Sequence, residues 1–145
     1  MIVEIIVGAI VIKDNKILMV RETKKDCYGK WAFPAGHMEE NESILDGAKR
    51  ETKEETGCDI KLKKVFPIIS NNKNIVMIHF LADVIKETME YDINEIIETK
   101  WIELEQLKKM KEDELRSYPV VNFIIQSLEE KHLYELDIIQ NLTDL

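Results

Sequence analysis

The pattern of apolar and polar residues divides the chain into short strands and two longer helices. Residues 2–12 are almost continuous in valine and isoleucine, which is typical of a strand buried on both faces. A polar turn at 13–16 separates this segment from an apolar run at 17–20, so the two are predicted to form a hairpin. The same reasoning predicts further strands at 31–33, 60–69, 75–85 and 99–104.

The clearest predicted helix runs from about residue 43 to residue 56. Asn41 or Ser43 can cap its N-terminus, and Gly57 stands where a left-handed C-terminal cap is expected. Its packing face is predicted from residues at helical spacing, namely Leu45, Ala48 and Thr52. Along the chain, predicted strands both precede and follow this helix.

The remaining segments are less regular. Pro34 is expected to end the strand before it, with a turn beginning at 35–36, and residues 87–97 form an irregular acidic connection. A short helical turn is expected around Leu107, and Pro119 is expected to open a last helix that reaches about residue 130. Residues 132–145 form a tail for which the pattern predicts no structure. Together the elements predict one domain over 1–145 with a mixed sheet and helices on its faces.

Composition excludes several classes of protein. The chain has 145 residues and a formal net charge of −8, with no dense basic block, which argues against binding to duplex nucleic acid. No apolar run is long enough to cross a membrane, and the N-terminus lacks a secretory pattern. The two cysteines, Cys27 and Cys58, form no metal or disulfide spacing, so a reducing cytoplasm is predicted.

Three glutamates on the predicted helix carry the first indication of chemistry. Glu51, Glu54 and Glu55 stand at i, i+3 and i+4, so their carboxylates share one face near the C-terminus of the helix. Both their mutual repulsion and the helix dipole are unfavourable there. A hard divalent cation such as Mg²⁺ would offset both, and Gly47 one turn earlier would let the preceding loop or a substrate approach. Taken alone, however, an acidic helix face is most often a solvated surface.

The residues around these glutamates favour the metal site. Gly36, five residues, Glu42, seven residues and then Arg50-Glu51 through Gly57 match the Nudix box, G-x5-E-x7-R-E-U-x-E-E-x-G-U, at every charged and glycine position. The chain therefore resembles the Nudix (MutT-like) hydrolases, and the similarity extends over roughly residues 5–130. The two positions usually aliphatic are Thr52 and Cys58, both small enough to pack inward.

The resemblance implies an α/β/α sandwich with a mixed β-sheet, in which the box forms a loop–helix–loop. It also implies hydrolysis of a phosphoanhydride in a nucleoside diphosphate-linked substrate. Carried over by position, the Gly36 carbonyl, Glu51, Glu54 and Glu55 would hold Mg²⁺, or Mn²⁺. Glu51 is the favoured general base and Glu95 the other candidate base or ligand, while Arg50 assists and Glu42 supports.

Substrate choice is less determined by the sequence. Arg21, Phe33 and Asn122 resemble positions that contact phosphate or base in enzymes that remove oxidised purine nucleotides, so a (deoxy)nucleoside triphosphate of that kind is expected. Asn122 near a helix start is equally well explained as a local backbone partner. His37 is interpreted as a solvated loop histidine and His79 as structural.

Several functions stay open at this point. The substrate could instead be ADP-ribose, a nucleotide sugar or a dinucleoside polyphosphate. A catalytically silent Nudix domain that only binds a nucleotide is a further alternative, although the intact set of three glutamates argues against it. A homodimer is left open, because dimers are common in the family and the sequence shows no interface.

Overall fold

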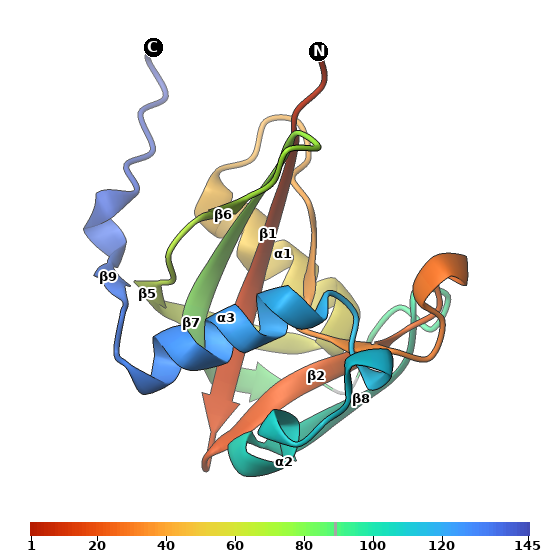
Figure 1. The fold of residues 1–145 in the computed structure, drawn as a ribbon. Coiled ribbons are helices and arrows are strands. Elements are labelled where there is room, and N and C mark those ends of the chain that lie inside the picture. The colour runs from red at the N-terminus through yellow and green to blue at the C-terminus, as the bar shows by residue number, and fades with distance from the viewer. Residues whose placement is uncertain (89) are drawn as a thin grey trace.

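The computed structural model describes residues 1–88 and 90–145, and these form one mixed β-sheet with a helix against each face (Figure 1). The central strands are β1 (Glu4–Lys13) and β7 (Ile75–Glu87), which pair in parallel, while the other strand pairs are antiparallel. The main path of the sheet has the order β3-β2-β1-β7-β5-β9. The remaining strands of this path are β2 (Lys16–Glu22), β3 (Trp31–Ala32), β5 (Cys58–Val65) and β9 (Tyr134–Glu135).

Three further strands join this path from the side. β4 (Ala35–His37) pairs with β1, β6 (Ile69–Ser70) pairs with β7, and β8 (Ile96–Glu103) pairs with β2. The helices are α1 (Ile44–Thr56), α2 (Leu104–Lys108) and α3 (Tyr118–Glu129). Short 3₁₀ turns occur at Lys25–Cys27, Glu112–Glu114 and Leu136–Ile138.

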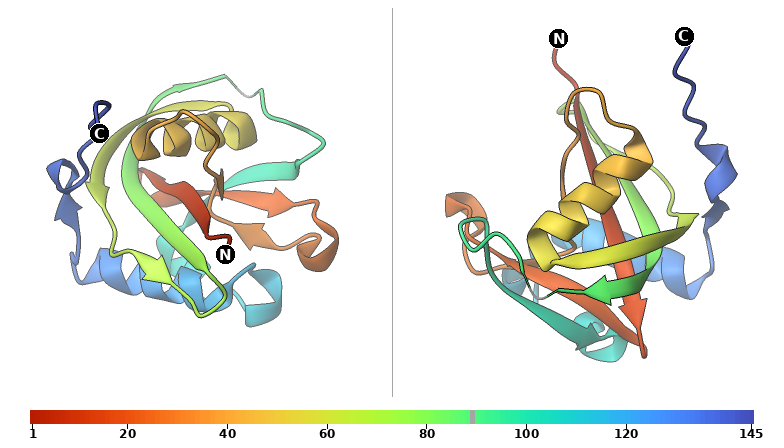
Figure 2. Two further views of the ribbon diagram at one scale, coloured as in Figure 1. Left: turned by 90° about the horizontal axis from the view of Figure 1, so that it is seen from above. Right: turned by 180° about the vertical axis from the view of Figure 1, so that it is seen from behind.

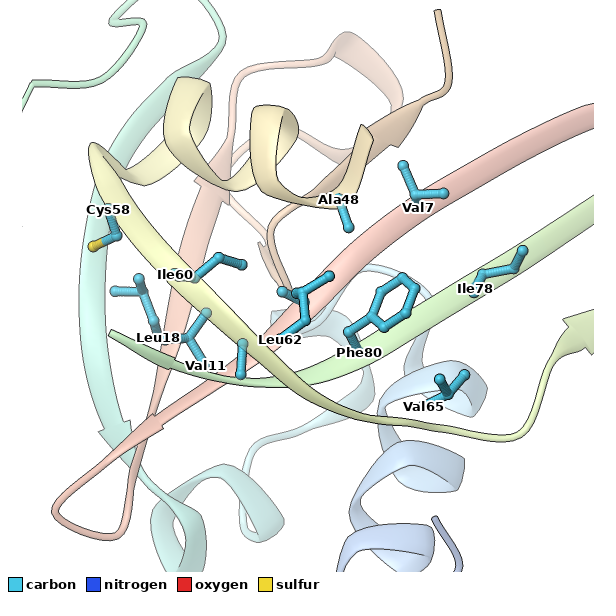
Figure 3. Packing of buried hydrophobic residues seen from close by; sticks show 12 residues of the cluster. Val7, Val11, Leu18, Ala48, Cys58, Ile60, Leu62, Val65, Ile78 and Phe80 are labelled. Carbon is cyan, nitrogen blue, oxygen red and sulfur yellow. The ribbon is translucent and has the colours of Figure 1, made fainter. Parts of the chain in front are cut away.

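The two faces of the sheet bury separate hydrophobic clusters, because side chains along a strand point alternately to opposite sides. Figure 3 shows the cluster under α1, where Ala48 packs above Val7 of β1, Leu62 of β5 and Phe80 of β7. The opposite cluster lies under α3 and includes Phe66, Ile124 and Ile125. The view from above in Figure 2 shows the sheet between the two helices, so the expected α/β/α sandwich with a mixed sheet is confirmed.

Most predicted elements are found within a few residues of their expected bounds. The first hairpin forms with Asp14 and Asn15 at positive φ, which suits a tight turn between β1 and β2. The first strand was expected to be buried throughout, but its N-terminal end is exposed, and Ile2 and Ile5 face solvent. The last helix starts one residue before Pro119, and the tail contributes β9 and a 3₁₀ turn that the pattern did not predict.

Two local predictions were wrong. Residues 35–36 do not begin a turn: they continue as β4 along β1, where the Pro34 carbonyl accepts a hydrogen bond from the Ala9 N–H at 3.1 Å. The predicted strand at 60–69 is divided, because Pro67 has no N–H to continue the ladder and Phe66 turns into the core.

Within the described residues, no helix is long and apolar enough to span a membrane.

Candidate functional site

Helix α1 is fixed at both ends by the caps that its sequence predicts. The Ser43 hydroxyl accepts a hydrogen bond from the Asp46 N–H at 3.1 Å, which satisfies one of the free donors of the first turn. Gly57 adopts the left-handed conformation with φ of 74°, and its N–H donates to the Lys53 carbonyl. Ala48 and Thr52 are fully buried against the sheet. This packing sets which face of α1 turns toward residues 35–42, the loop made of β4 and the residues that connect it to α1.

Arg50 ties the helix to that loop. Its guanidinium donates two hydrogen bonds to the Glu42 carboxylate, both at 2.8 Å, and a third to the His37 carbonyl at 3.0 Å. Its Nη1 also donates to Glu51 at 2.8 Å and to Glu54 at 3.2 Å. The hydrogen bonds from Arg50 hold the pKa of Glu42 below its usual value. Arg50 therefore both reaches Glu42 before the helix and bridges two carboxylates along the helix.

Two of the three predicted ligand carboxylates are buried beneath the loop. Glu55 is 3% exposed and accepts a hydrogen bond from the Ala35 N–H at 3.0 Å, and burial raises its pKa to about 8. Glu51 is 8% exposed, and burial raises its pKa as well, with the hydrogen bond from Arg50 opposing the change. Glu54 is exposed to solvent. Buried carboxylates with raised pKa values are a common property of functional sites.

Gly36 is needed at its position because of Glu51. A Cβ on Gly36 would lie 2.3 Å from both the Cδ and the Oε2 of Glu51, far closer than atoms of this kind can approach. Gly47 has a similar role near the start of α1, where a Cβ would lie 3.0 Å from Glu42 Oε1. The backbone at Gly36 can therefore press against Glu51 of α1 only because that position lacks a side chain, while Gly47 leaves room on the helix for the Glu42 side chain.

These residues fit a divalent cation by their chemistry, although they do not already surround one. Oxygen ligands from carboxylates and a backbone carbonyl suit Mg²⁺, and no Lys or Arg within the described residues forms an ion pair with the buried Glu55. In the described part of the chain no group of three acidic, cysteine or histidine side chains converges as a metal site. Two of the predicted ligand carboxylates, those of Glu51 and Glu54, instead accept hydrogen bonds from Nη1 of Arg50.

A cavity of about 280 Å³ opens beside Gly36, between the sheet and the N-terminal end of α3. Much of its wall is apolar and comes from Ile6, Ile69, Ile75, Met77, Val120 and Val121. Phe33 and Gly36 also line it, and Gly36 contacts the carboxylate of Glu51. The cavity therefore adjoins, at Gly36, the segment that lies against the acidic face of α1, although Glu51, Glu54 and Glu55 are not part of its wall.

Four polar residues of this cavity wall were not predicted as functional: Glu22, Lys24 and Arg116 were not singled out from the sequence, and His79 was interpreted as structural. Glu22 is 2% exposed and pairs with Arg116 at 3.0 Å, and its charge contributes to the raised pKa of Glu55 after the larger effect of burial. Arg116 comes from a loop 94 residues away in the chain. The pattern around Glu22 offered no indication of this pairing, because it depends on how β2 and the loop before α3 meet.

Of the three residues predicted to contact the substrate, one lines the cavity and two lie outside it. Phe33 lines the cavity, whereas Arg21 donates hydrogen bonds to the Gly29 carbonyl and to Glu98 on the outside of β2. Asn122 is exposed on α3 and is not among the described residues of the cavity wall. The predicted contacts of Arg21 and Asn122 with substrate stay predictions.

Glu95, the alternative general base, is exposed in the loop before β8. Its backbone carbonyl accepts a hydrogen bond from the Thr23 hydroxyl at 2.8 Å, which ties this loop to the end of β2. Its charge is one of the smaller causes of the raised pKa of Glu51, after burial. Glu95 therefore lies near enough to the acidic face of α1 to influence it electrostatically.

Comparison with known proteins identifies the family of this chain. The NUDIX domain family model matches residues 4–122, which is most of the chain. A NUDIX hydrolase from Nitrosomonas europaea has the same fold, with a TM-score of 0.86, 25% identity, and coverage of 99% of this chain and 100% of that one. The sequence is 39% identical over 101 residues to the 8-oxo-dGDP phosphatase NUDT18 of Danio rerio, covering 66% of this chain and 31% of that protein.

A second relative is named for a different activity. The ADP-ribose pyrophosphatase of Methanocaldococcus jannaschii is 31% identical over 105 residues, which cover 62% of each chain. This chain thus spans about a third of the length of the first relative and less than two thirds of the second. The extent of the NUDIX domain match and the shared fold nevertheless determine the family. The chain belongs to the Nudix hydrolases.

Proposed function

We propose that this chain hydrolyses a phosphoanhydride bond in a purine nucleotide, with Mg²⁺ or Mn²⁺ as cofactor. The substrate we propose is a (deoxy)nucleoside triphosphate or diphosphate with an oxidised purine base. The observation that carries the proposal is the meeting of the acidic face of α1 with the apolar cavity at Gly36. A nucleotide needs both regions, because its base is flat and largely apolar while its phosphates are strongly charged.

The ligands we propose for the cation are the Gly36 carbonyl, Glu51, Glu54 and Glu55. Bound there, a divalent cation would neutralise phosphate charge and lower the pKa of water. Arg50 would release Glu51 and Glu54 for this role while keeping its two hydrogen bonds to Glu42, so the loop would stay attached to the helix. Glu42 and Arg50 are in this sense supporting residues.

The reaction itself requires one proton acceptor. Water adds to a phosphorus atom, the bond from that phosphorus to the bridging oxygen breaks, and the electron pair leaves with the departing phosphate. The proton of the attacking water passes to a carboxylate, for which we propose Glu51 because it adjoins the loop at Gly36. Glu95 is the alternative acceptor, since it lies on the opposite loop near Glu51.

Relatives support the choice of substrate class. The first of them is named for 8-oxo-dGDP, a nucleotide with an oxidised purine base. The archaeal relative is named for ADP-ribose, which makes that compound the second candidate. The two candidates differ in the group attached to the nucleoside diphosphate, so their products separate them.

The test is chromatographic analysis of the products formed with Mg²⁺ and with EDTA, namely nucleoside monophosphates, phosphate, pyrophosphate and sugar phosphates. The panel of substrates comprises canonical and oxidised purine nucleotides, ADP-ribose, nucleotide sugars and dinucleoside polyphosphates. We expect metal-dependent formation of a nucleoside monophosphate from the purine nucleotides. Hydrolysis of ADP-ribose to AMP and ribose 5-phosphate at a higher kcat/KM would favour the second candidate. Binding of nucleotides without any turnover would replace the enzyme with a binding-only domain.

The site assignment is tested by removing one ligand at a time. Glu54→Gln and Glu55→Gln should each lower kcat by about 100-fold or more, because each removes a negatively charged ligand of the cation that neutralises the substrate phosphates. The matched control is Glu105→Gln, which neutralises an exposed glutamate on α2 that forms an ion pair with Lys108. Near-normal turnover in both box variants would contradict the assignment, provided that circular dichroism shows the fold intact.

A further inference from the structure

His79 is a buried histidine with an unusual set of neighbours. It lies on β7 beside Gly8 of β1 in the register of the sheet, is 2% exposed, and forms part of the cavity wall. Phe33 meets its ring edge-on, with 6.4 Å between ring centroids and 71° between planes. Its strand neighbours Ile78 and Phe80 belong to the opposite cluster under α1. The imidazole therefore lies on the face of the sheet that α3 covers, where the cavity is.

The imidazole also has an unsatisfied nitrogen. Its Nδ1 is a buried side-chain atom without any hydrogen-bond partner among the described residues. Burial lowers the pKa of His79 to about 4, so the ring is neutral near pH 7 and offers one N–H donor and one acceptor. Leaving a buried polar group unpaired is unfavourable, and such a group in a native fold needs an explanation.

The cavity around His79 is suited to a flat ring. Its volume of about 280 Å³ is close to the smallest pockets that hold drug-sized molecules, roughly 300 Å³, so it suits a base better than a whole dinucleotide. Met77 lies two residues before His79 on the same face of β7, and Val120 and Val121 of α3 also line the cavity, so much of the wall suits the apolar face of a ring. The charged part of the wall, which comes from Glu22, Lys24 and Arg116, suits polar groups. A heterocyclic base combines an apolar face with a polar edge of donors and acceptors.

We propose that His79 is a specificity-determining residue, whose imidazole forms a hydrogen bond with the polar edge of a purine base held in this cavity. The inference rests on the proposed function and adds to it the group that reads the base. The base packs against Phe33 and the apolar wall, while its phosphates extend past Gly36 toward α1. Because Nδ1 has almost no accessible surface, this hydrogen bond requires the imidazole to turn until that nitrogen faces the cavity, and the bond then gives Nδ1 the partner that it lacks among the described residues.

The test compares two substitutions at position 79. His79→Phe keeps a flat ring without nitrogens, and we expect it to weaken dGMP binding about 3- to 10-fold, the size of one neutral hydrogen bond. Its KM for purine nucleotides should rise by the same factor while kcat stays within about twofold, because the base lies away from the reacting phosphorus. His79→Gln retains an amide donor and acceptor and should recover some of the lost affinity.

Two comparisons separate recognition from structure. Ile78→Val changes the next residue of the same strand, which faces the other cluster, so it should lower stability without changing affinity for dGMP. Affinity for dCMP should change little in any variant. Equal affinity of wild type and His79→Phe for dGMP, or an equal loss for dGMP and dCMP, would overturn the role of His79.

The binding measurement is made by calorimetry without metal, so it does not depend on catalysis. If the wild-type protein hydrolyses no nucleotide in the presence of Mg²⁺, the proposed function fails, and the dGMP and dCMP affinities still decide the role of His79. If hydrolysis is observed but the base preference is the same in all variants, the proposed function stands and the role of His79 is rejected.

Discussion

The residue at position 36 is limited by the space that neighbouring side chains leave for it. Gly36 shows this clearly, because the Glu51 carboxylate occupies the space that a Cβ would need, at 2.3 Å. The Ala35 N–H beside it donates to Glu55, so two successive residues of β4 contact two carboxylates of α1. A side chain at Gly36 would have to displace Glu51 or lift the loop, and either movement would disturb the proposed metal ligands.

Gly36→Ala should therefore lower kcat by about 100-fold, the cost of misplacing a reacting or ligand group by about 1 Å. The rate is measured with Mg²⁺ on the best substrate of the panel, and thermal unfolding is followed in parallel. Gly29→Ala is the control, since Gly29 has φ of +80° but a Cβ there would meet nothing closer than the Arg21 side chain at 3.6 Å. We expect that control to lose stability and keep its rate. A fully active Gly36→Ala protein would contradict the close packing of loop and helix.

At the level of elements, the tail closes an edge of the sheet. β9 pairs with β5 through Val65 and Tyr134, and the 3₁₀ turn after it packs Leu136 against the cluster under α1. An ion pair between Lys64 and Glu135 adds to this contact. The sequence of the tail shows no strand pattern, because only two of its residues pair in a strand and both are exposed. Short edge strands of this kind depend on the partner strand rather than on their own sequence.

Deletion of residues 132–145 should destabilise the protein by about 2 kcal/mol, because it uncovers β5 and removes the partly buried Leu133, Leu136 and Ile139. For a domain of this size, that corresponds to a fall in Tm of roughly 4–8 °C. Deletion of residues 141–145 is the matched control, since all five are exposed and should matter little. Equal Tm values for the two truncated proteins would show that the tail contributes nothing to the fold.

For the whole molecule, the sequence predicted features that depend on neighbouring residues, but it did not predict contacts between segments that are far apart in the chain. The caps of α1 and the acidic spacing of Glu51 and Glu55 depend on neighbours within a few residues, and the structure has them as expected. The pairing of Glu22 with Arg116 and the position of His79 in the cavity wall depend on which strands meet, which periodicity does not determine. The wrong turn at 35–36 has the same origin, because β4 forms only where β1 is beside it. The arrangement of the box along α1 was therefore predictable from the sequence, while the wall of the cavity was not.

The charge distribution leads to the last prediction, which concerns the stability of the entire fold. The chain has a net charge of −8, and α1 places two buried carboxylates together, of which Glu51 pairs with Arg50. A cation that binds the folded state alone should stabilise it by about 2.7 kcal/mol at 100 times its Kd, which would raise Tm by roughly 5–10 °C. Thermal unfolding with Mg²⁺ and with EDTA measures this difference. Glu55→Gln should abolish the shift, and Glu105→Gln should keep it, because only the first removes a proposed ligand. A shift of the same size in all three proteins would mean that the cation binds elsewhere, and its absence from the wild type would leave the acidic face of α1 without a metal.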